Sequence, residues 1–376
     1  MIEKSRISLR DNHLNCVAEV AAIDPQAAGS SQPGQEVEYL VALLVSRGMQ
    51  SLENKQFADA LGYFESALYL APDHAGAQYG RNRIHRKLIP RWHFEMLNDE
   101  ERNHAFETAL AKAITDNTIV LDIGSGSGLL AMMAARAGAR ETVTCEMIAP
   151  VAALARRTIA LNGFGDRITV LDMKSTSIQV GIDMPRRANL LVTETVDCGL
   201  LGEGIIPSVA HARTHLLTED ARIIPCSASV MCCAVESERL LHLNRAGMAA
   251  GFNVSPINHF ATAGYFPVRL AAFDYKPLTD PFEVFHFDFR EDLKAQESRT
   301  IHVPVIRDGV CHAFVLWFEM QLDDEISISN RPGSGTHWEQ ALQCLESGSP
   351  VQAGKTMNVL ADHDYTSLSI TLAASG

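Results

Sequence analysis

Hydrophobic and polar positions follow three different patterns along the 376-residue chain. From Glu38 to Leu88 apolar residues recur at helical spacing, which predicts packed helices. After Pro90 short apolar runs alternate with helical stretches, and from Cys226 onward β-rich segments separated by turn residues predominate. These changes of pattern agree with the two or three packed units expected for a chain of this length.

The segment ahead of the helical pattern has a different composition. Residues 24–37 are rich in Gly, Pro, Ser and Gln, which bury too little apolar surface to offset the entropy lost on ordering. The sequence therefore predicts a short head and a flexible linker over residues 1–37.

Residues 38–90 are expected to form tetratricopeptide-like helices. The offsets of that repeat are occupied by suitable residues, namely Gly48, Ala60, Phe64, Ala67 and Pro72. One full repeat and a following helix over residues 75–88 fit in this segment. Because a single repeat cannot bury its own faces, it is expected to pack on the chain's next domain or on a partner protein. A plain helical hairpin without a ligand is the alternative.

The middle region alternates strands with helices, which predicts an α/β fold with a parallel, doubly wound sheet over residues 91–225. Strands are expected at 118–123, 142–146, 168–172 and 190–194, with helices at 129–137 and 150–162. Residues 226–376 are expected to form an antiparallel β domain. A single helix is expected in that domain, at the HWEQALQCL segment of residues 337–345.

The charge balance limits the classes of partner. Lys plus Arg number 32 and Asp plus Glu number 45, so the formal net charge of -13 repels a phosphate backbone and disfavours direct nucleic-acid binding. The chain has no leader-like first segment and no run of about eighteen apolar residues, so no membrane contact is expected. A soluble cytoplasmic protein is expected, or a nuclear one if the source is eukaryotic.

Cysteine and histidine spacing gives no sign of a metal site. The 8 cysteines include no CxxC pair, so they are expected to be reduced and mostly buried. His211 and His215 have a spacing that can bind a metal ion, but no Glu or Cys accompanies them in a zinc-type motif. No metal is therefore expected.

A glycine turn follows the first strand of the expected sheet. VLDIGSGSGLLAMMAARAG combines an apolar strand, the glycines Gly124 and Gly126, and a helix, so that a ligand can approach the backbone. Asp122, just ahead of the first glycine, repels a pyrophosphate and suits the ammonium group of S-adenosylmethionine. Glu146 ends the next strand, where a carboxylate can accept hydrogen bonds from both ribose hydroxyls. The turn therefore favours S-adenosylmethionine over a dinucleotide.

Two glutamates lie close together in VTETVDCGLLGEG, residues 192–204. Glu194 and Glu203 are both expected at the ligand edge of the sheet. Two carboxylates about 4 Å apart repel by up to about 4 kcal/mol at an effective dielectric constant of about 20, so a cation is expected between them. A guanidinium has planar, forked donors that match two carboxylates, and with a sulfonium it brings the charge of the site to zero. The segment thus predicts a guanidinium facing the methyl donor.

Four motifs in this order carry a family resemblance: RWHFEMLNDEERN, VLDIGSGSGLL, VTETVDCGLLGEG and THW at 336–338. From about Pro90 to its C-terminus the chain resembles the protein arginine methyltransferases. It is most similar to the branch of the family's ninth animal member, which has an N-terminal tetratricopeptide region and dimethylates arginine symmetrically. The resemblance implies a Rossmann-like S-adenosylmethionine methyltransferase domain at 91–225 and an antiparallel β-barrel-like substrate domain at 226–376.

The resemblance also implies which residues bind the cofactor. His93 and Arg102 would contact its methionine moiety, and the Arg102 guanidinium also has the forked shape that matches a carboxylate. Gly124 would contact the cofactor through its backbone, and Glu146 the ribose. Thr176 lies where many members have an adenine-binding Glu, so that contact is expected from the main chain.

Further positions correspond to the family's catalytic and substrate-binding residues. By resemblance, Glu194 and Glu203 would clamp the arginine and Trp338 would form a wall of its pocket. Met96 would border the reacting nitrogen, and His337 would pair with Asp99 to tie the N-terminal helix over the pocket, so the catalytic set is Glu194, Glu203, His337 and Asp99. The product of the cofactor would be S-adenosylhomocysteine.

The chain departs from the family pattern in two respects. Trp92-His93-Phe94 replaces the YFxxY-like opening of other members. The animal relative carries a second, degenerate methyltransferase module for which this chain has no room. A homodimer is therefore expected to supply the pairing, through the insertion near residues 240–266.

Three functions remain open from the sequence. The first is mono- and symmetric dimethylation of arginine in a protein or peptide substrate. The second is methylation of a small guanidino compound or another metabolite, and the third is an inactive methyltransferase fold that serves as a scaffold. Intact acidic residues at 122, 146, 194 and 203 argue against the third.

Overall fold

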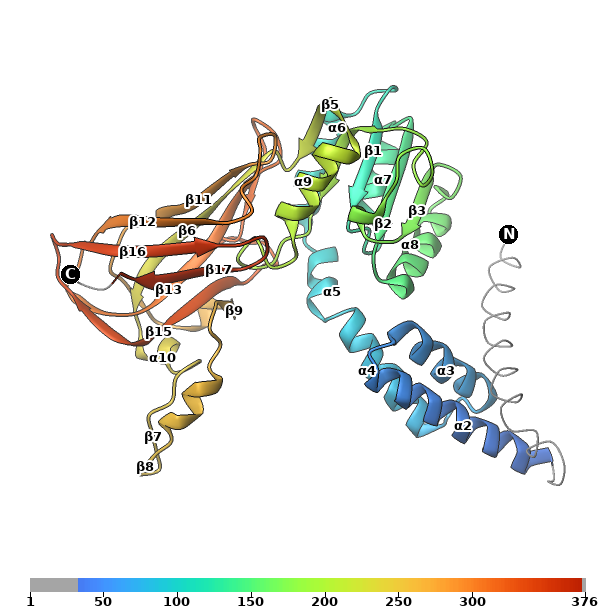
Figure 1. Ribbon diagram of the computed structural model, residues 1–376, viewed down its shortest axis with the longest axis horizontal. Helices are drawn as coiled ribbons and strands as arrows, with labels where there is room; N and C mark the ends of the chain where they lie inside the picture. The colour runs from blue at the N-terminus through green and yellow to red at the C-terminus, as the bar shows by residue number, and fades with distance from the viewer. Residues whose placement is uncertain (1–32, 374–376) are drawn as a thin grey trace. The chain divides into compact units, whose positions relative to one another are not determined.

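The computed structural model describes residues 33–373, and the chain divides into two compact units, residues 1–94 and 95–376. The described part of the first unit is helical, and the second contains the sheets (Figure 1). No helix within residues 33–373 is long and apolar enough to cross a membrane.

Three helices make up most of the N-terminal unit: α2 (Pro33–Glu53), α3 (Phe57–Leu70) and α4 (Ala75–Leu88). Helix α2 begins at Pro33, where the fixed φ of proline suits the first helical turn. Residues 33–37 of the predicted linker are therefore helical, while the rest of the predicted head, with Cys16, lies outside the described residues.

The Phe64 side chain forms the centre of this helical unit. Phe64 is fully buried, and its ring lies against Gly48 of α2 and Gly80 of α4. A Cβ atom at Gly80 would lie 2.2 Å from the ring, and one at Gly48 would lie 2.8 Å from it, so both positions require glycine. The contact explains the glycine at 48 and the aromatic residue at 64, while assignment to the tetratricopeptide class stays a prediction.

Five parallel strands form the first sheet of the second unit, in the order β3-β2-β1-β4-β5. Their bounds are β1 Ile119–Ile123, β2 Glu141–Glu146, β3 Ile168–Asp172, β4 Ala188–Thr193 and β5 Leu217–Ile224. Every residue of β1 is buried, as expected for a central strand covered on both faces. The chain order reverses at β1, between β2 and β4, which is where parallel sheets bind ligands. The predicted doubly wound sheet is confirmed.

A short helix precedes this sheet in the chain, and further helices connect and cover its strands (Figure 1). Their bounds are α5 Trp92–Leu97, α6 Glu100–Ala113, α7 Leu129–Arg136, α8 Ala149–Leu161 and α9 Ile205–His215, with the short 3-10 turn η2 at Ser175–Ser177. Asp99 caps α6, because its side chain accepts a hydrogen bond of 2.9 Å from the Arg102 backbone N–H. This cap fixes where α6 begins, beside the carboxyl ends of the strands.

The predicted antiparallel domain is also confirmed. Its main sheet has seven strands, in the order β10-β6-β13-β15-β9, with β11 paired to β6 and β14 to β13; a second sheet is β12-β16-β17. The bounds are β6 Ser227–Glu236, β9 Phe266–Val268, β10 Lys276–Pro277, β11 Phe282–Asp288, β12 Glu297–Pro304, β13 Gly309–Gln321, β14 Ser327–Ser329, β15 Gln340–Val351, β16 Thr356–His363 and β17 Leu368–Leu372. Short helical turns are α10 Glu238–Leu241, η3 Ser255–Phe260 and η4 Leu270–Ala272.

The helix predicted at residues 337–345 is wrong, because this segment leads into strand β15 (Gln340–Val351). β15 lies between β13 and β9, and residues 340–344 are all buried. A strand covered on both faces loses the alternation of polar and apolar residues that identifies strands in a sequence. Pairing with distant strands therefore decided the structure of this segment.

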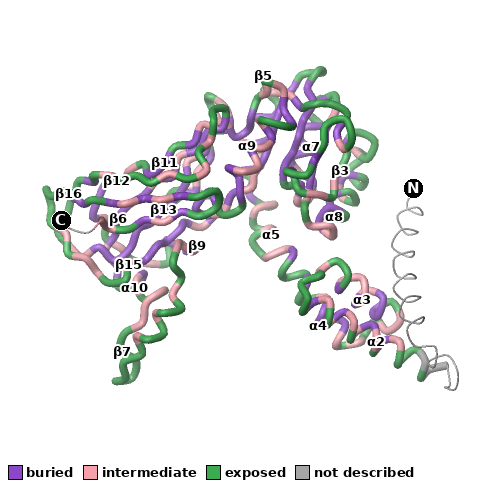
Figure 2. The backbone as a smooth tube through the Cα atoms, in the orientation of Figure 1, coloured by how far each residue is buried: buried purple, intermediate pink, exposed green. Residues whose placement is uncertain are grey.

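A long extension leaves the main sheet between α10 and β9 (Figure 1). This segment, residues 242–264, is called the arm below; it contains η3 and the hairpin of β7 (Met248–Ala249) and β8 (Phe252–Asn253). Figure 2 shows that the arm is mostly exposed, in contrast to the buried strands of both sheets.

A continuous apolar core joins the parallel and antiparallel sheets. It includes Phe106 of α6, Leu191 of β4 and Phe318 of β13, all fully buried. Leu200 and Leu201, from the loop between Glu194 and Glu203, belong to the same core and are also fully buried. The segment that carries the two glutamates is therefore anchored where the two sheets meet.

Candidate active site

The carboxyl ends of three neighbouring strands bring acidic residues to one edge of the parallel sheet. Asp122 lies in β1, Glu146 ends β2, and Glu194 follows β4 directly. These strands are adjacent, in the order β2-β1-β4. Residues separated by up to 72 positions in the sequence thus face the same ligand edge, as the sequence predicted from the strand pattern.

The glycine turn between β1 and α7 depends on backbone conformations that favour glycine. The φ angles of Gly124, Gly126 and Gly128 are +89°, +50° and +85°. A Cβ atom at Gly124 would lie 2.8 Å from the Thr195 methyl group, and one at Gly128 would lie 2.9 Å from Ile159. Any side chain would therefore strain the backbone, and at two of these positions it would also collide with a neighbour.

The Glu146 carboxylate is oriented by the same turn. Its Oε2 accepts a hydrogen bond of 3.2 Å from Gly126 N–H, and its Oε1 accepts one of 3.0 Å from Ile148 N–H. A carboxylate held by two backbone donors keeps lone pairs for further donors. The arrangement suits the ribose hydroxyls predicted for this position.

Asp122 is fully buried beneath this turn. Its Oδ2 accepts a hydrogen bond of 2.7 Å from Thr144 Oγ1, whereas Oδ1 has no partner within residues 33–373. Burial raises the pKa of Asp122 to about 7, against the opposing effect of the Thr144 hydrogen bond. An acceptor oxygen in this environment favours a cationic or hydrogen-donating ligand nearby.

Arg102 forms a buried ion pair with Glu194. The Arg102 Nη2 donates to Glu194 Oε2 at 2.7 Å, with only 3% and 8% of the two side chains exposed. Its Nη1 donates to Asn103 Oδ1 at 2.8 Å, and its Nε has no partner in the described part of the chain. The sequence predicted that Arg102 contacts the cofactor's carboxylate. Its pairing with Glu194 adds a positive charge to the site, which the predicted sum of two carboxylates, one guanidinium and one sulfonium did not include.

Glu203 lies at the far end of the loop from Glu194, and residues 194–203 are called the acid loop below. Gly204 follows in the left-handed conformation, with φ +83°, and α9 begins at the next residue. Burial by the surrounding protein, followed by the negative charges of Glu194, Asp197 and Glu146, raises the pKa of Glu203 to about 8. Water reaches the exposed side of Glu203 and screens part of this electrostatic effect.

Asp99 and His337 form a second buried pair. Asp99 Oδ2 lies 2.9 Å from His337 Nδ1 and accepts a hydrogen bond of 2.7 Å from the His337 backbone N–H. Burial lowers the pKa of His337, while the hydrogen bond with Asp99 opposes this shift. Since Asp99 also caps α6, the pair ties the start of that helix to the turn before β15. The structure therefore brings these two predicted partners together.

The remaining predicted residues vary in their placement. Trp338 is buried, with its ring edge-on to Phe318 at 5.1 Å. Met96 is partly buried on α5, and Thr176 is exposed in η2. His93 lies in the N-terminal unit, and its contact with the cofactor stays a prediction.

Three residues that brace the acid loop were not among the predicted site residues. Asp197 caps the loop's own backbone, and its Oδ2 accepts a hydrogen bond of 2.8 Å from the Tyr265 hydroxyl. Asn330, fully buried, donates to the carbonyl oxygens of Cys198 at 3.0 Å and Glu339 at 2.8 Å. The sequence could have indicated Asp197, because it is a charged residue among the apolar residues between Glu194 and Glu203. It could not have indicated Tyr265 or Asn330, because their contacts join segments that are far apart in the chain.

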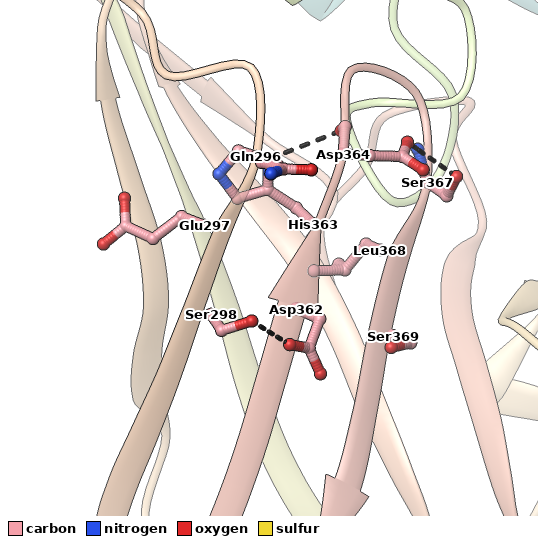
Figure 3. A pocket seen from close by; sticks show the side chains of 9 residues that line it. All are labelled: Gln296, Glu297, Ser298, Asp362, His363, Asp364, Ser367, Leu368 and Ser369. Carbon is pink, nitrogen blue, oxygen red and sulfur yellow. Dashed lines mark hydrogen bonds between the residues drawn. The ribbon is translucent and has the colours of Figure 1, made fainter.

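A pocket of about 490 Å³ lies away from these residues, between β12, β16 and β17 (Figure 3). Its lining includes His363 and the carboxylates of Glu297, Asp362 and Asp364, but none of the predicted site residues. Asp364 and Asp362 already accept hydrogen bonds from Ser367 and Ser298. The chemistry predicted from the sequence therefore lies at the edge of the parallel sheet, outside this pocket.

Comparisons with family models agree with this architecture. Residues 227–365 match the arginine methyltransferase oligomerization subdomain, and residues 107–195 match the ribosomal protein L11 methyltransferase model. An arginine N(omega)-methyltransferase of Streptomyces achromogenes is 43% identical over 76% of this chain and 79% of its own length. The chain belongs to the protein arginine methyltransferase family.

Two animal relatives are longer than this chain. Human protein arginine N-methyltransferase 9 is 36% identical over 76% of this chain, which spans 38% of that protein. Protein arginine N-methyltransferase 7 of Drosophila melanogaster is 34% identical over 73% of this chain, which spans 46% of that protein. The chain thus spans less than half the length of these two relatives.

Solved structures share the fold. The Trypanosoma brucei PRMT1 enzyme-prozyme heterotetrameric complex with AdoHcy has a TM-score of 0.66 at 23% identity, covering 77% of this chain and 95% of that one. Arabidopsis thaliana protein arginine methyltransferase 10 has a TM-score of 0.60 at 21% identity, covering 72% of this chain and 86% of that one. These likenesses confirm the predicted combination of a Rossmann-like domain and an antiparallel domain.

The residues at the sheet edge fit S-adenosylmethionine, the donor expected from the sequence. The glycine turn leaves the backbone open to close approach, and Glu146 keeps acceptors for a ribose. Asp122 Oδ1 and Arg102 Nε are buried polar atoms without partners within residues 33–373, one an acceptor and one a donor. Such a pair matches the ammonium and carboxylate of a methionine moiety in sign.

Proposed function

We propose that the chain transfers methyl groups from S-adenosylmethionine to the guanidino nitrogens of arginine residues in proteins. The observation that carries this proposal is the buried pair between Glu194 and the guanidinium of Arg102, 2.7 Å apart at the carboxyl edge of the sheet. One carboxylate of the acid loop thus already accepts a guanidinium from within the chain. Glu203, at the other end of the loop, supplies the second carboxylate for an arginine from outside.

The proposed catalytic role of the two glutamates is orientation and charge stabilisation. When bound, S-adenosylmethionine supplies an electrophilic methyl group, and the chain must align a guanidino nitrogen with it. Hydrogen bonds to Glu194 and Glu203 would draw positive charge toward one side of the guanidinium and leave electron density on the reacting nitrogen. Trp338 and Met96 are proposed to exclude water and to limit the space around that nitrogen.

Two groups are candidates to accept the proton that the guanidinium loses. Glu203 is one, because the surrounding protein favours its protonated form. The Asp99–His337 pair is the other, since His337 Nε2 has no partner in the described region. A His337→Gln variant that loses most of its turnover while binding cofactor and peptide normally would identify the pair; near-normal turnover would identify Glu203.

Mass spectrometry of the products tests the proposed function. The enzyme is incubated with isotopically labelled S-adenosylmethionine and with Arg-rich or Gly/Arg peptides, and fragmentation locates each methyl group. We expect methyl groups on guanidino nitrogens only, as monomethyl and symmetric dimethyl arginine. Label on other side chains, or no label on any form of arginine, would reject the proposal.

Free arginine is a second candidate substrate. The Streptomyces relative, 43% identical to this chain, is named for arginine without reference to protein. Competition between free arginine and an arginine peptide for limiting enzyme separates the two candidates, because the product ratio gives the ratio of kcat/KM values. A ratio that favours the amino acid would replace the protein substrate with the metabolite.

We also propose a homodimer joined through the arm. Residues 227–365 match the family's oligomerization subdomain, and the arm exposes apolar side chains that a monomer has no reason to display, namely Met248, Phe252, Ile257 and Phe260. The Phe252→Asp variant should shift the mass measured by light scattering from dimer to monomer. The exposed Tyr365→Asp variant, outside the arm, serves as the control. A monomeric wild-type enzyme would reject this arrangement.

Location and further partners remain part of the proposal. The seven cysteines in residues 33–373 are unpaired, which agrees with a reducing compartment such as the cytoplasm. The helices α2 to α4, which expose Tyr79, are proposed to bind a protein partner, one of the two possibilities that the repeat pattern left open. Deleting residues 1–90 should then abolish capture of that partner but leave methyl transfer to short peptides.

A further inference from the structure

The backbone of the acid loop is held in a conformation that its sequence does not favour. Leu200 is fully buried, yet its φ is +81°, in the left-handed region that residues other than glycine rarely adopt. Such a conformation persists only where surrounding contacts require it. Leu200 lies between Glu194 and Glu203, so whatever holds Leu200 also sets the relative position of the two carboxylates.

Asp197 supplies several of the contacts that hold this loop. Its Oδ1 accepts hydrogen bonds from Gly199 N–H at 3.2 Å and Gly202 N–H at 2.9 Å, and its backbone oxygen accepts one from Leu200 N–H at 3.0 Å. The Asp197 side chain thus bonds the backbone on both sides of the strained residue. All of these partners are donors, as an ionised carboxylate requires.

Tyr265 fixes Asp197 from outside the loop. The Tyr265 hydroxyl donates to Asp197 Oδ2 at 2.8 Å, and the ring lies so close to Gly199 that a Cβ atom there would be 2.4 Å from Cζ. A Cβ atom at Gly202 would likewise be 2.3 Å from Asp197 Oδ2. Burial and the Asp197 charge raise the pKa of the Tyr265 hydroxyl, so it stays protonated and donates. Tyr265 directly follows the arm, just before β9.

We propose that Asp197 and Tyr265 are a pair of positioning residues that hold the acid loop in the shape needed for Glu203 to face the same guanidinium as Glu194. This inference rests on the proposed function. Neither residue touches the reacting atoms; they act through the loop backbone. The pair also makes the segment that ends the arm a structural part of the active site.

Four variants test the pair. Tyr265→Phe removes a single oxygen atom and should lower kcat about tenfold, as expected for the loss of a hydrogen bond to a charged group, while the Kd for S-adenosylhomocysteine stays within twofold. Asp197→Ala should lower kcat about 100-fold or more. Asp197→Asn should restore most of it, because its Oδ1 still accepts both glycine N–H bonds and its amide can donate to the Tyr265 oxygen. In the double variant of Asp197→Ala with Tyr265→Phe, the loss should not exceed that of Asp197→Ala alone.

Tyr275→Phe is the matched control, since Tyr275 is also partly buried in the antiparallel domain but packs against a core cluster that contains no residue of the acid loop. Its kcat should equal that of the wild type. The inference is overturned if Tyr265→Phe keeps its kcat within twofold, if the two losses multiply in the double variant, or if the loss appears in cofactor Kd instead.

Hydrogen exchange separates this inference from the proposed function. The Gly199 and Gly202 amides should exchange at least about tenfold faster in Tyr265→Phe and Asp197→Ala than in the wild type, whatever the substrate. Unchanged exchange with normal folding rejects the pair. A wild-type enzyme that methylates no form of arginine rejects the proposed function, and accelerated exchange would then still support the pair as the brace of the loop.

Discussion

The glycine turn and the acid loop face the same ligand edge but are built in different ways. The glycine turn is fixed by local contacts, such as the hydrogen bonds from Gly124 and Gly126 N–H to Cys145 and Glu146, the end of the next strand. The acid loop is fixed by distant side chains, because Tyr265 and Asn330 bond it from 68 and 132 positions away. The cofactor half of the site can thus form from a short sequence, whereas the arginine half requires the antiparallel domain.

This difference implies that the two halves can be damaged separately. Changes in the acid loop should reduce turnover and leave cofactor binding intact. Changes in the glycine turn should reduce cofactor binding first.

Glu194→Gln should lower kcat by about 10²- to 10³-fold, the range found for removing one preorganised charge-stabilising group. The glutamine amide oxygen can still accept the hydrogen bond that Arg102 Nη2 donates to Glu194 Oε2 at 2.7 Å. The Kd of the cofactor should therefore stay within about threefold of the wild-type value. Stopped-flow turnover and calorimetric titration of S-adenosylhomocysteine measure the two quantities. Glu283→Gln, an exposed change on β11, is the control, and unchanged turnover in Glu194→Gln would reject the clamp.

Gly124→Ala should weaken cofactor binding by about ten- to 100-fold, corresponding to about 1–3 kcal/mol of backbone strain. Its Cβ atom would also lie 2.8 Å from the Thr195 methyl group. Gly138→Ala is a matched control, because Gly138 has φ +101° but no atom within 4 Å of its added Cβ and lies outside the turn. If both variants bind S-adenosylhomocysteine equally well, the turn is not the cofactor site.

Asn330→Ala should destabilise the protein by about 1–3 kcal/mol, because the buried Phe318 N–H loses its acceptor and the carbonyl oxygens of Cys198 and Glu339 lose this donor. Chemical denaturation measures the change in the free energy of unfolding. The exposed Asn253→Ala variant should change it by less than about 0.5 kcal/mol. Equal losses in the two variants would contradict the bracing role of Asn330.

The pH dependence of kcat/KM should report Glu203. This carboxyl must ionise to hold a guanidinium, and its pKa in the free enzyme is raised to about 8, so kcat/KM should increase with pH through that region. The Asp197 charge contributes to this raised pKa, so Asp197→Asn should move the acid limb to lower pH. The Asp288→Asn variant should not move it, because the Asp288 carboxylate in β11 pairs with Arg290 and does not contribute to the raised pKa of Glu203. A limb that stays in place in Asp197→Asn would show that Glu203 does not control it.

The comparison of the two halves also explains what the sequence could predict. Asp122, Gly124 and Glu146 follow from a local pattern of strand, glycine turn and next strand, and Glu194 follows from its place at the end of a strand. Tyr265 and Asn330 could not be predicted, because nothing near them indicates a bond to the acid loop. The wrong helix at residues 337–345 has the same origin, since distant strands bury both faces of β15.

One contact in the site was not predicted from the sequence. Arg102 was expected to contact the methionine moiety of the cofactor, which stays a prediction, and the structure also pairs it with Glu194. The predicted charge sum left Arg102 out, whereas in the structure Asp99 caps α6 and bonds His337, and α6 brings Arg102 to Glu194. The charge balance of the site is therefore a property of the folded unit rather than of any one segment.

Two carboxylates are proposed to recognise the positive charge of a guanidinium, and calorimetric titration with a neutral isostere tests this recognition. The S-adenosylhomocysteine-bound enzyme is titrated with arginine and with citrulline, each as a peptide and as the free amino acid, near pH 8.5. We expect at least one form of arginine to bind and its citrulline counterpart to bind at least about 100-fold more weakly, consistent with the loss of a charged pair in a desolvated site. Equal affinities for arginine and citrulline would contradict the account.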